Sequence, residues 1–122
     1  MAKVIGLGGI FFKSRDPAAL TAWYAKHLGL DAEAWGGARF VEDEQRPGYT
    51  LWSPFAADTE YFGPGPQGCM INFRVDDLDA LLAQLRAAGV AVDERVEQSE
   101  FGRFGWITDP EGARVELWQP PR

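Results

Sequence analysis

The pattern of this 122-residue chain occurs twice, and the repeat limits the possible folds more than any other feature. Asp16 in the first half aligns with Asp77 in the second at a spacing of 61 residues, each between a strand-like stretch and a helix-like stretch. Residues 49–54 align with 115–120 at a spacing of 66. Such self-similarity indicates two copies of one supersecondary unit within the chain.

The first copy predicts a strand, a helix and two short strands. An apolar stretch predicts a strand at 7–14, and Asp16 with Pro17 suits the start of a helix. The helix is expected at 18–28, with Leu20, Trp23, Tyr24 and Leu28 on one face and Gly29 at its end. Two short strands are expected at 37–42 and 49–52, separated by a polar turn at 43–48.

The second copy predicts the same order of elements. Residues 70–75 alternate as in a strand, and Asp76 with Asp77 precedes a helix that ends at Gly89. Further strands are expected at 90–92, 104–108 and 114–118, with a turn at 109–112 before the last one.

These elements predict an α+β fold built from two tandem βαβββ modules. We expect a single domain over 1–122, because a chain of this length supports one core of normal size. The first module is expected at about 4–54, the connection at 55–68 and the second module at about 69–120.

Charge and composition exclude several classes of function. Twelve basic against eighteen acidic residues give a net charge of −6, which disfavours nucleic acid as a partner. No apolar run reaches the roughly 18 residues that span a bilayer, so no membrane partner is expected. Cys69 is the only cysteine, which fits a reducing, cytoplasmic location, and we expect it to be a small buried apolar residue.

Three motifs carry a resemblance to a known family. The stretches DPAALTAWYAKHLGL, INFRVDDLDALLAQLRAAGV and FGRFGWITDPEGARVELWQP resemble the vicinal oxygen chelate superfamily, which includes glyoxalases, extradiol dioxygenases and bleomycin-resistance proteins. The resemblance covers essentially the whole chain. It implies that the modules form U-shaped mixed sheets around a cleft, and that the protein is a homodimer. Because one scaffold supports many activities, it implies a fold more strongly than a function.

The resemblance also implies where metal ligands would lie. The four positions that carry ligands in metal-using members correspond to Gly9, Thr50, Met70 and Glu116. Of these, only Glu116 suits a hard or borderline divalent ion, which needs three or four N or O donors. The only histidine, His27, falls near the end of the first predicted helix, where a contact with the helix dipole is expected. We therefore expect no cofactor, with a divalent metal as the alternative.

Strand alternation extends these positions into candidate cleft residues. Glu116 is the candidate catalytic residue. The candidate ligand-binding residues are Phe11, Thr50, Trp52, Met70, Asn72, Arg74, Phe104 and Trp118. The opposite faces are apolar and are expected to seat the two helices, through Ile10, Phe12, Ile71, Phe73, Val75, Val115 and Leu117.

Structural roles remain open for the same residues. Glu116 can instead pair with Lys13, Arg74 or Arg114 across the sheet. Trp52 and Trp118 occupy matching positions in the repeat, so both can be packing residues, and Asn72 can satisfy backbone groups.

Two loops add further candidates. Tyr61, Phe62 and Phe101 fall in predicted loops, where aromatic residues suit a binding surface or a dimer contact. Gly102 and Gly105 suggest a loop that moves over the cleft.

Two classes of function follow from these observations. The first is metal-independent binding of a small aromatic or cationic molecule in the cleft, through cation–π contacts and the acidic charge balance. The second is a lyase or dioxygenase of the glyoxalase type in which Glu116 holds a metal with unusual donors, with Glu60 and Glu100 as spare carboxylates. A metal-free enzyme with Glu116 as general base, or an interaction module without a small ligand, also remains open. The sequence therefore leaves open whether the protein is an enzyme and which ligand it binds.

Overall fold

The computed structural model describes residues 1–28, 30–40, 49–109 and 112–121. Its elements in chain order are β1 (Val4–Ser14), α1 (Pro17–Leu28), β2 (Ala38–Phe40), β3 (Thr50–Ala56), β4 (Cys69–Val75), α2 (Leu78–Ala87), β5 (Ala91–Ser99), β6 (Gly102–Thr108) and β7 (Arg114–Gln119). The predicted turn at 43–48 lies outside this description. So do the side chains at 23, 24 and 26–28, which include His27.

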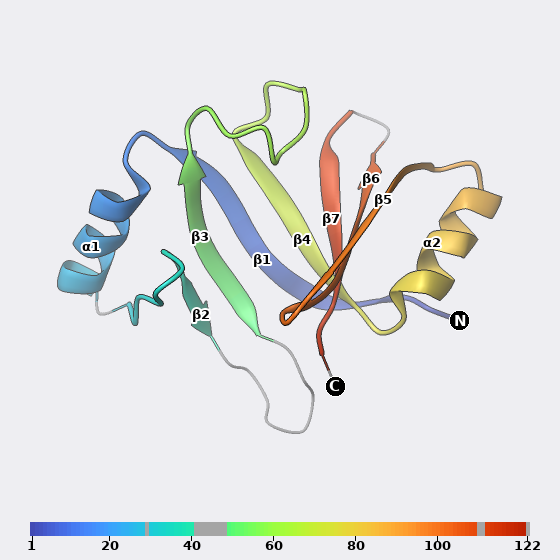
Figure 1. Ribbon diagram of the computed structural model, residues 1–122, viewed down its shortest axis with the longest axis horizontal. Helices are drawn as coiled ribbons and strands as arrows, with labels where there is room; N and C mark the ends of the chain where they lie inside the picture. The colour runs from blue at the N-terminus through green and yellow to red at the C-terminus, as the bar shows by residue number, and fades with distance from the viewer. Residues whose placement is uncertain (29, 41–48, 110–111, 122) are drawn as a thin grey trace.

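All seven described strands form one open mixed sheet in the order β2-β3-β1-β4-β7-β6-β5. Within each module the first and last strands are parallel neighbours, β1 with β3 and β4 with β7. The modules join through β1 and β4, which pair antiparallel at the centre of the sheet. The two helices lie toward opposite ends of the sheet (Figure 1). The predicted α+β class is confirmed.

Helix α2 begins and ends where the sequence predicts. The Asp77 side chain accepts a hydrogen bond from the Ala80 amide at 3.1 Å, and Gly89 after the helix has a φ of +79°, which favours glycine. Leu78, Leu81 and Leu82 are buried against Val75 and Leu117 of the sheet. Full burial of each leucine contributes about 1.5–3 kcal/mol, so this face anchors the second module.

Helix α1 begins at a matching cap. The Asp16 carboxylate accepts from the Ala19 amide at 3.1 Å, as Asp77 does in the second module. The Thr21 hydroxyl donates to the Gly36 carbonyl at 2.8 Å, which ties the helix to the segment before β2. Among the described residues, no helix is long and apolar enough to cross a membrane.

The structure corrects the prediction for the β5–β6 region. β5 runs for nine residues where a three-residue strand at 90–92 was expected. The predicted mobile loop around Gly102 and Gly105 is part of β6, which pairs with β5 on one side and β7 on the other. Gly105 packs against Leu82 and Leu78 of α2, so close packing explains this glycine.

Two predictions about burial are also wrong. Ile10 was expected to seat a helix, but it is 46% exposed. Cys69 was expected to be buried, but it is exposed. Cys69 pairs with Phe12 of β1 at the start of β4, where it alternates with the buried Met70.

The segment between the modules packs onto the sheet. Phe62 is fully buried with Phe11, Met70 and Trp106, which corrects the prediction of an aromatic residue at a loop surface. The Gln67 amide accepts from the Arg114 backbone N–H at 2.9 Å and donates to the Arg114 carbonyl at 3.3 Å. The side chain thereby takes the place of a strand neighbour beside the start of β7.

Candidate functional site

A cavity of about 210 Å³ lies on the face of the sheet opposite α2. Most of its wall is aromatic, from both modules and from the segment between them: Phe11, Trp35, Tyr49, Phe55, Tyr61, Phe101, Phe104 and Trp118. The other lining residues are Arg39, Leu51, Ser53 and Glu116. A mostly apolar wall with a few polar groups is typical of small-molecule sites.

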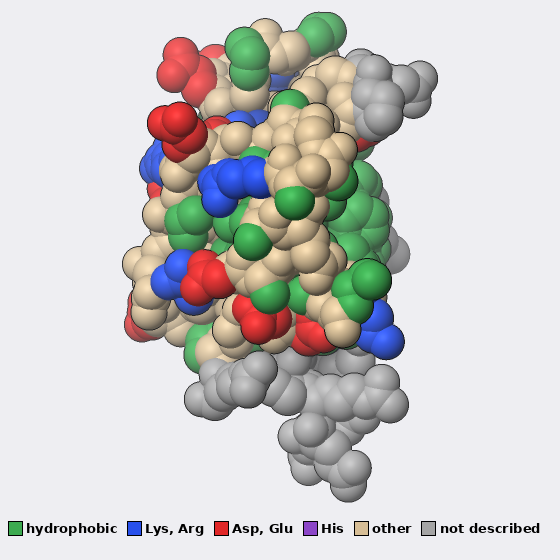
Figure 2. Space-filling model, turned by 90° about the vertical axis from the view of Figure 1, so that its right-hand side faces the viewer, with side chains coloured by type: hydrophobic (Ala, Val, Ile, Leu, Met, Phe, Trp, Pro, Cys, Tyr) green, Lys and Arg blue, Asp and Glu red, His purple; other side chains and the backbone are tan. Residues whose placement is uncertain are grey.

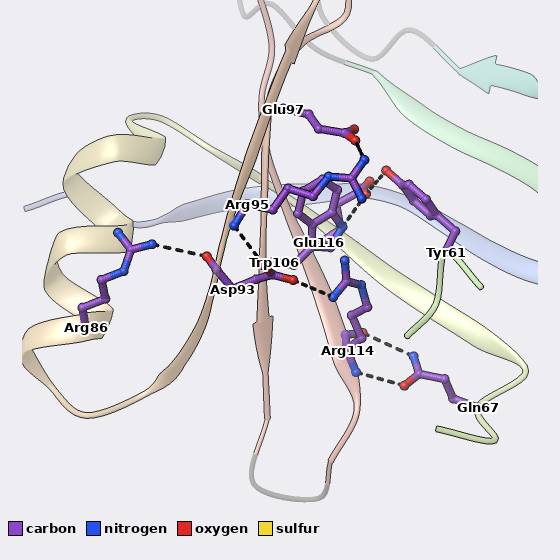
Figure 3. Close-up of polar contacts among 9 residues, drawn as sticks. All are labelled: Tyr61, Gln67, Arg86, Asp93, Arg95, Glu97, Trp106, Arg114 and Glu116. Carbon is purple, nitrogen blue, oxygen red and sulfur yellow. Dashed lines mark hydrogen bonds and ion pairs between the residues drawn. The ribbon is translucent and has the colours of Figure 1, made fainter. Parts of the chain in front are cut away.

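Glu116 of β7 is the buried acid of this cavity, with 1% of its surface exposed. Its carboxylate accepts three hydrogen bonds: from the Tyr61 hydroxyl at 2.6 Å, the Asn72 amide at 2.5 Å and the Trp106 indole N–H at 2.9 Å. Figure 3 shows Tyr61 reaching Glu116 from the segment between the modules. Each donor satisfies part of the buried carboxylate, which would otherwise be strongly destabilising.

Burial and hydrogen bonding act in opposite directions on this acid. Burial raises the pKa of Glu116, and the three donors together with the Arg114 charge lower it, with a net shift upward. Burial, followed by the proximity of Glu116, raises the pKa of the Tyr61 hydroxyl, which therefore stays protonated and remains a donor. The site thus holds a carboxyl group that keeps its proton to a higher pH than an exposed glutamate does.

Trp106 of β6 is held between the carboxylate and two arginines. Its ring is fully buried, and the guanidinium carbons of Arg114 and Arg95 lie 5.0 Å and 5.6 Å from its centroid. Arg114 is fixed by Asp93 of β5 at 3.1 Å, and Arg95 pairs with Glu97 (Figure 3). These cation–π contacts and ion pairs hold the indole N–H toward Glu116.

Asn72 of β4 is positioned by the absence of a side chain on β1. Its side chain is fully buried, and a Cβ atom at Gly8 would collide with its Oδ1. This oxygen has no hydrogen-bond partner among the described residues, while Nδ2 donates to Glu116. Gly8 therefore leaves the space that lets the Asn72 amide reach the acid.

Four of the predicted site residues line the cavity: Phe11, Phe104, Glu116 and Trp118. Three others lie on the predicted side of β4 but outside the lining. Met70 is buried beneath it, Asn72 contacts Glu116, and Arg74 lies beside Gly6. The possible ion pair of Glu116 with a basic residue is replaced by the three neutral donors, and Arg114 pairs with Asp93.

The prediction for β3 is wrong by one residue. Leu51, Ser53 and Phe55 line the cavity, so Thr50 and Trp52 belong to the other side of the strand. The Trp52 ring instead contacts Phe12 at 5.4 Å between centroids. A slip of one position in an alternating strand exchanges its two faces, which explains why both residues were misplaced together.

Several lining residues had no signal as a site in the sequence. Trp35, Arg39 and Tyr49 come from parts of the first module outside the aligned cleft positions. Tyr61 and Phe101 stood out only as aromatic residues in predicted loops. The spare carboxylates Glu60 and Glu100 are exposed and lie outside the lining.

The donors around Glu116 do not fit a divalent ion. Of the other family positions, Gly9 has no side chain and Met70 is buried among apolar groups, while β3 presents Leu51, Ser53 and Phe55. Among the described residues no group of three or more His, Cys, Asp or Glu side chains could hold a metal. Tyr61, Asn72 and Trp106 offer hydrogen-bond donors to the carboxylate where metal ligands would be required.

Comparisons with solved structures place the fold among related proteins. A methylmalonyl-CoA epimerase variant from Streptomyces coelicolor superposes with a TM-score of 0.74 and 17% identity, covering 98% of this chain and 100% of that chain. The Mycobacterium tuberculosis methylmalonyl-CoA epimerase gives 0.66 and 21%, covering 98% and 90%. A glyoxalase/bleomycin resistance protein/dioxygenase superfamily member from Vibrio splendidus 12B01 gives 0.57 and 12%, covering 98% and 99%.

A sequence model of a protein family also matches the chain. The comparison with curated proteins finds no match. The model described as a glyoxalase-like domain matches residues 9–118, which run from the second half of β1 through most of β7 and contain every cavity-lining residue. The chain therefore belongs to the glyoxalase-like domain family, within the vicinal oxygen chelate superfamily.

Proposed function

We propose that this protein binds a small aromatic or cationic molecule in its cavity without the help of a metal ion. The observation that carries the proposal is a buried carboxyl group, held by three neutral donors, in a cavity with mostly aromatic walls. Aromatic faces attract planar rings and cations, and Glu116 offers one further acceptor position to a ligand.

Fluorescence titration tests this proposal, because Trp35 and Trp118 line the cavity. Benzylammonium and benzamidinium are suitable probes, each titrated with a chelator and then with added Mn²⁺, Ni²⁺ or Zn²⁺. We expect saturable changes that do not depend on the metal. Glu116→Gln should weaken binding of these probes, whereas Glu100→Gln, at an exposed position outside the cavity, should not.

Metal content provides the complementary measurement. Elemental analysis of protein purified without a chelator should find no stoichiometric divalent ion. A bound ion that Glu116→Ala removes would contradict the proposal and favour the lyase or dioxygenase alternative.

One observation favours a second candidate, a metal-free enzyme with Glu116 as general base. This carboxyl group lines a cavity that can hold a reactant, and burial raises its pKa, which makes its carboxylate a stronger base than that of an exposed glutamate. In that case Glu116→Gln would abolish proton exchange at a carbon acid while aromatic probes still bind. Unchanged exchange in the variant would exclude this role.

We also propose that the protein is a homodimer. Trp52, Ile10 and Ile71 lie in register across three neighbouring strands on the face opposite the cavity, with Ile10 46% exposed, and this row holds no charge in a chain of net charge −6. An uncharged apolar row allows two acidic copies to meet without repulsion. Light scattering should give twice the chain mass, and Ile10→Lys should give the monomer; a monomeric unmodified chain would refute the proposal.

A further inference from the structure

The described lining of the cavity carries one negative and one positive side chain, one from each module. Glu116 comes from β7 and Arg39 comes from β2, and three strands, β4, β1 and β3, lie between them in the sheet. The net charge of −6 is therefore not concentrated in the cavity, and acidic and basic side chains are interspersed over the outer surface at the α2 side of the molecule (Figure 2). A ligand can therefore meet a buried acceptor at Glu116, which we call the buried end of the cavity, and a half-exposed cation at Arg39, which we call the exposed end.

Arg39 is held in place by Glu33 and Tyr49, and its contacts within the described parts of the chain use only some of its guanidinium donors. Its Nε donates to Glu33 at 3.1 Å, and its guanidinium carbon lies 5.3 Å from the centre of the Tyr49 ring. Tyr49 in turn contacts Trp118 of β7 at 4.9 Å between ring centroids. A guanidinium has five N–H groups, so its terminal nitrogens can still bind a carboxylate, and the half-exposed side chain is accessible from solvent.

At the buried end, Glu116 favours a ligand group that donates a hydrogen bond. An ionised carboxylate has about four acceptor positions. Tyr61, Asn72 and Trp106 use three of them, which leaves room for one N–H or O–H group from a ligand. A ligand carboxylate at this end would face Glu116 directly and would be repelled.

The volume between the two ends limits the size of the ligand. The cavity of about 210 Å³ is smaller than the roughly 300–1,000 Å³ of pockets for drug-sized molecules. Phe11, Phe55 and Phe104 on its wall suit a flat ring. A single ring with short substituents matches both the volume and the wall.

We propose that the ligand is a small planar aromatic acid with an amino or hydroxyl donor at the end opposite its carboxylate. The donor binds Glu116, the ring lies against the aromatic wall, and the carboxylate binds Arg39. This inference rests on the proposed function and narrows it to molecules that carry both groups.

A matched set of probes tests this inference by tryptophan fluorescence. 4-Aminobenzoate and the longer 4-aminophenylacetate carry both groups, aniline carries only the donor, and benzoate carries only the acid. We expect the better of the two-ended probes to bind at least about tenfold more tightly than aniline or benzoate, from one additional charge-assisted contact.

Variants of Arg39 and Glu116 test which residue binds which group of the probe. Arg39→Gln should weaken the two-ended probe about five- to tenfold and leave aniline within twofold. Arg103→Gln is the matched control, because Arg103 forms an ion pair with Asp79 and lies outside the cavity lining. Glu116→Gln should weaken aniline and the two-ended probe alike, and circular dichroism establishes that each variant is folded.

Failure of this inference can be distinguished from failure of the proposed function. If aniline binds as tightly as the two-ended probes, or if Arg39→Gln weakens both classes equally, the selection of an acid is refuted while aromatic binding stands. If none of the ring-bearing probes binds, in this set or among the cations above, both proposals are refuted.

Discussion

The two modules share a strand order but differ in what they contribute. In the second module, three long strands follow α2, and the parallel pair β4–β7 places Asn72 beside Glu116. In the first module, the corresponding region holds an isolated bridge between Ala32 and Ala38 and the three-residue β2, and the parallel pair β1–β3 places Phe11 beside Ser53. The repeat therefore preserves the backbone arrangement, while the buried acid has no counterpart among the described residues of the first module.

The two modules contribute different parts of the candidate site. The acid and two of its three donors, Asn72 and Trp106, belong to the second module, and the third donor, Tyr61, belongs to the connecting segment. The first module supplies aromatic wall, Arg39 and the glycines that leave space beneath the site. Each module is incomplete as a site without the other.

The largest effect should come from the core beneath α2. Leu82→Ala should reduce the free energy of unfolding by about 2–5 kcal/mol, because Leu82 is 2% exposed among Val75, Leu78 and Leu117. Leu20→Ala in α1, at a half-buried position, should lose less than half of that amount. Urea unfolding measures both, and equal losses would show that the two helices are anchored equally.

An intermediate effect is expected at the glycines of β1. Gly8→Ala should destabilise the protein by roughly 1–3 kcal/mol, because the new Cβ atom would displace the Asn72 amide from Glu116. Gly6→Ala is the control, since its Cβ would meet only the end of the flexible Arg74 side chain at 3.0 Å. Similar losses in thermal or urea unfolding would show that the fit of Asn72 is not specific to Gly8.

A smaller, pH-dependent effect should belong to the second module alone. The folded state raises the pKa of Glu116 above 4.5, so the folded state binds a proton more tightly than the unfolded chain. The free energy of unfolding should therefore fall as pH rises from about 4.5 to the folded-state pKa, by at most about 1.4 kcal/mol per pH unit from this group.

Glu116→Gln should remove this contribution. The Asn72 amide can rotate in the variant so that its Oδ1 accepts from the new amide, which limits structural damage. Urea unfolding at a series of pH values makes the comparison, with Glu100→Gln as the control. An equal slope in Glu116→Gln and the unmodified protein would assign the pH dependence to another group.

The smallest effects should come from two arginines, one in each module. Arg39→Gln should change stability by about 0–1 kcal/mol, because its ion pair with Glu33 is exposed. Arg114→Gln should cost more, about 1–2 kcal/mol, since Arg114 also covers the Trp106 ring and is only 20% exposed. A larger loss at Arg39 would reverse the order expected from the two environments.

The same contrast explains how far the sequence could predict the structure. On β4 and β7, apolar residues alternate clearly with the others, so the faces of Asn72, Glu116 and Trp118 were predicted correctly. On β3, Thr50, Leu51 and Trp52 are all half-buried, so neither face has a clear pattern and the assignment slipped by one residue. Local alternation assigns a face only where one side is much more buried than the other.

The acid's surroundings depended on contacts between distant residues. Tyr61 reaches Glu116 across 55 positions of the chain, and Gly8 makes room for Asn72 from a different strand. Periodicity within a strand carries no information about such contacts. Glu116 itself was identified because it alone combined a cleft position with a chemically capable side chain.

The exposed position of Cys69 has a practical consequence. It is the chain's sole thiol, so a maleimide reagent would attach a dye, a spin label or a surface tether at one defined point. Met70 beside it faces the buried cluster beneath the cavity, so the thiol lies on the other side of the sheet. A probe placed there would report on the molecule without obstructing access to Glu116.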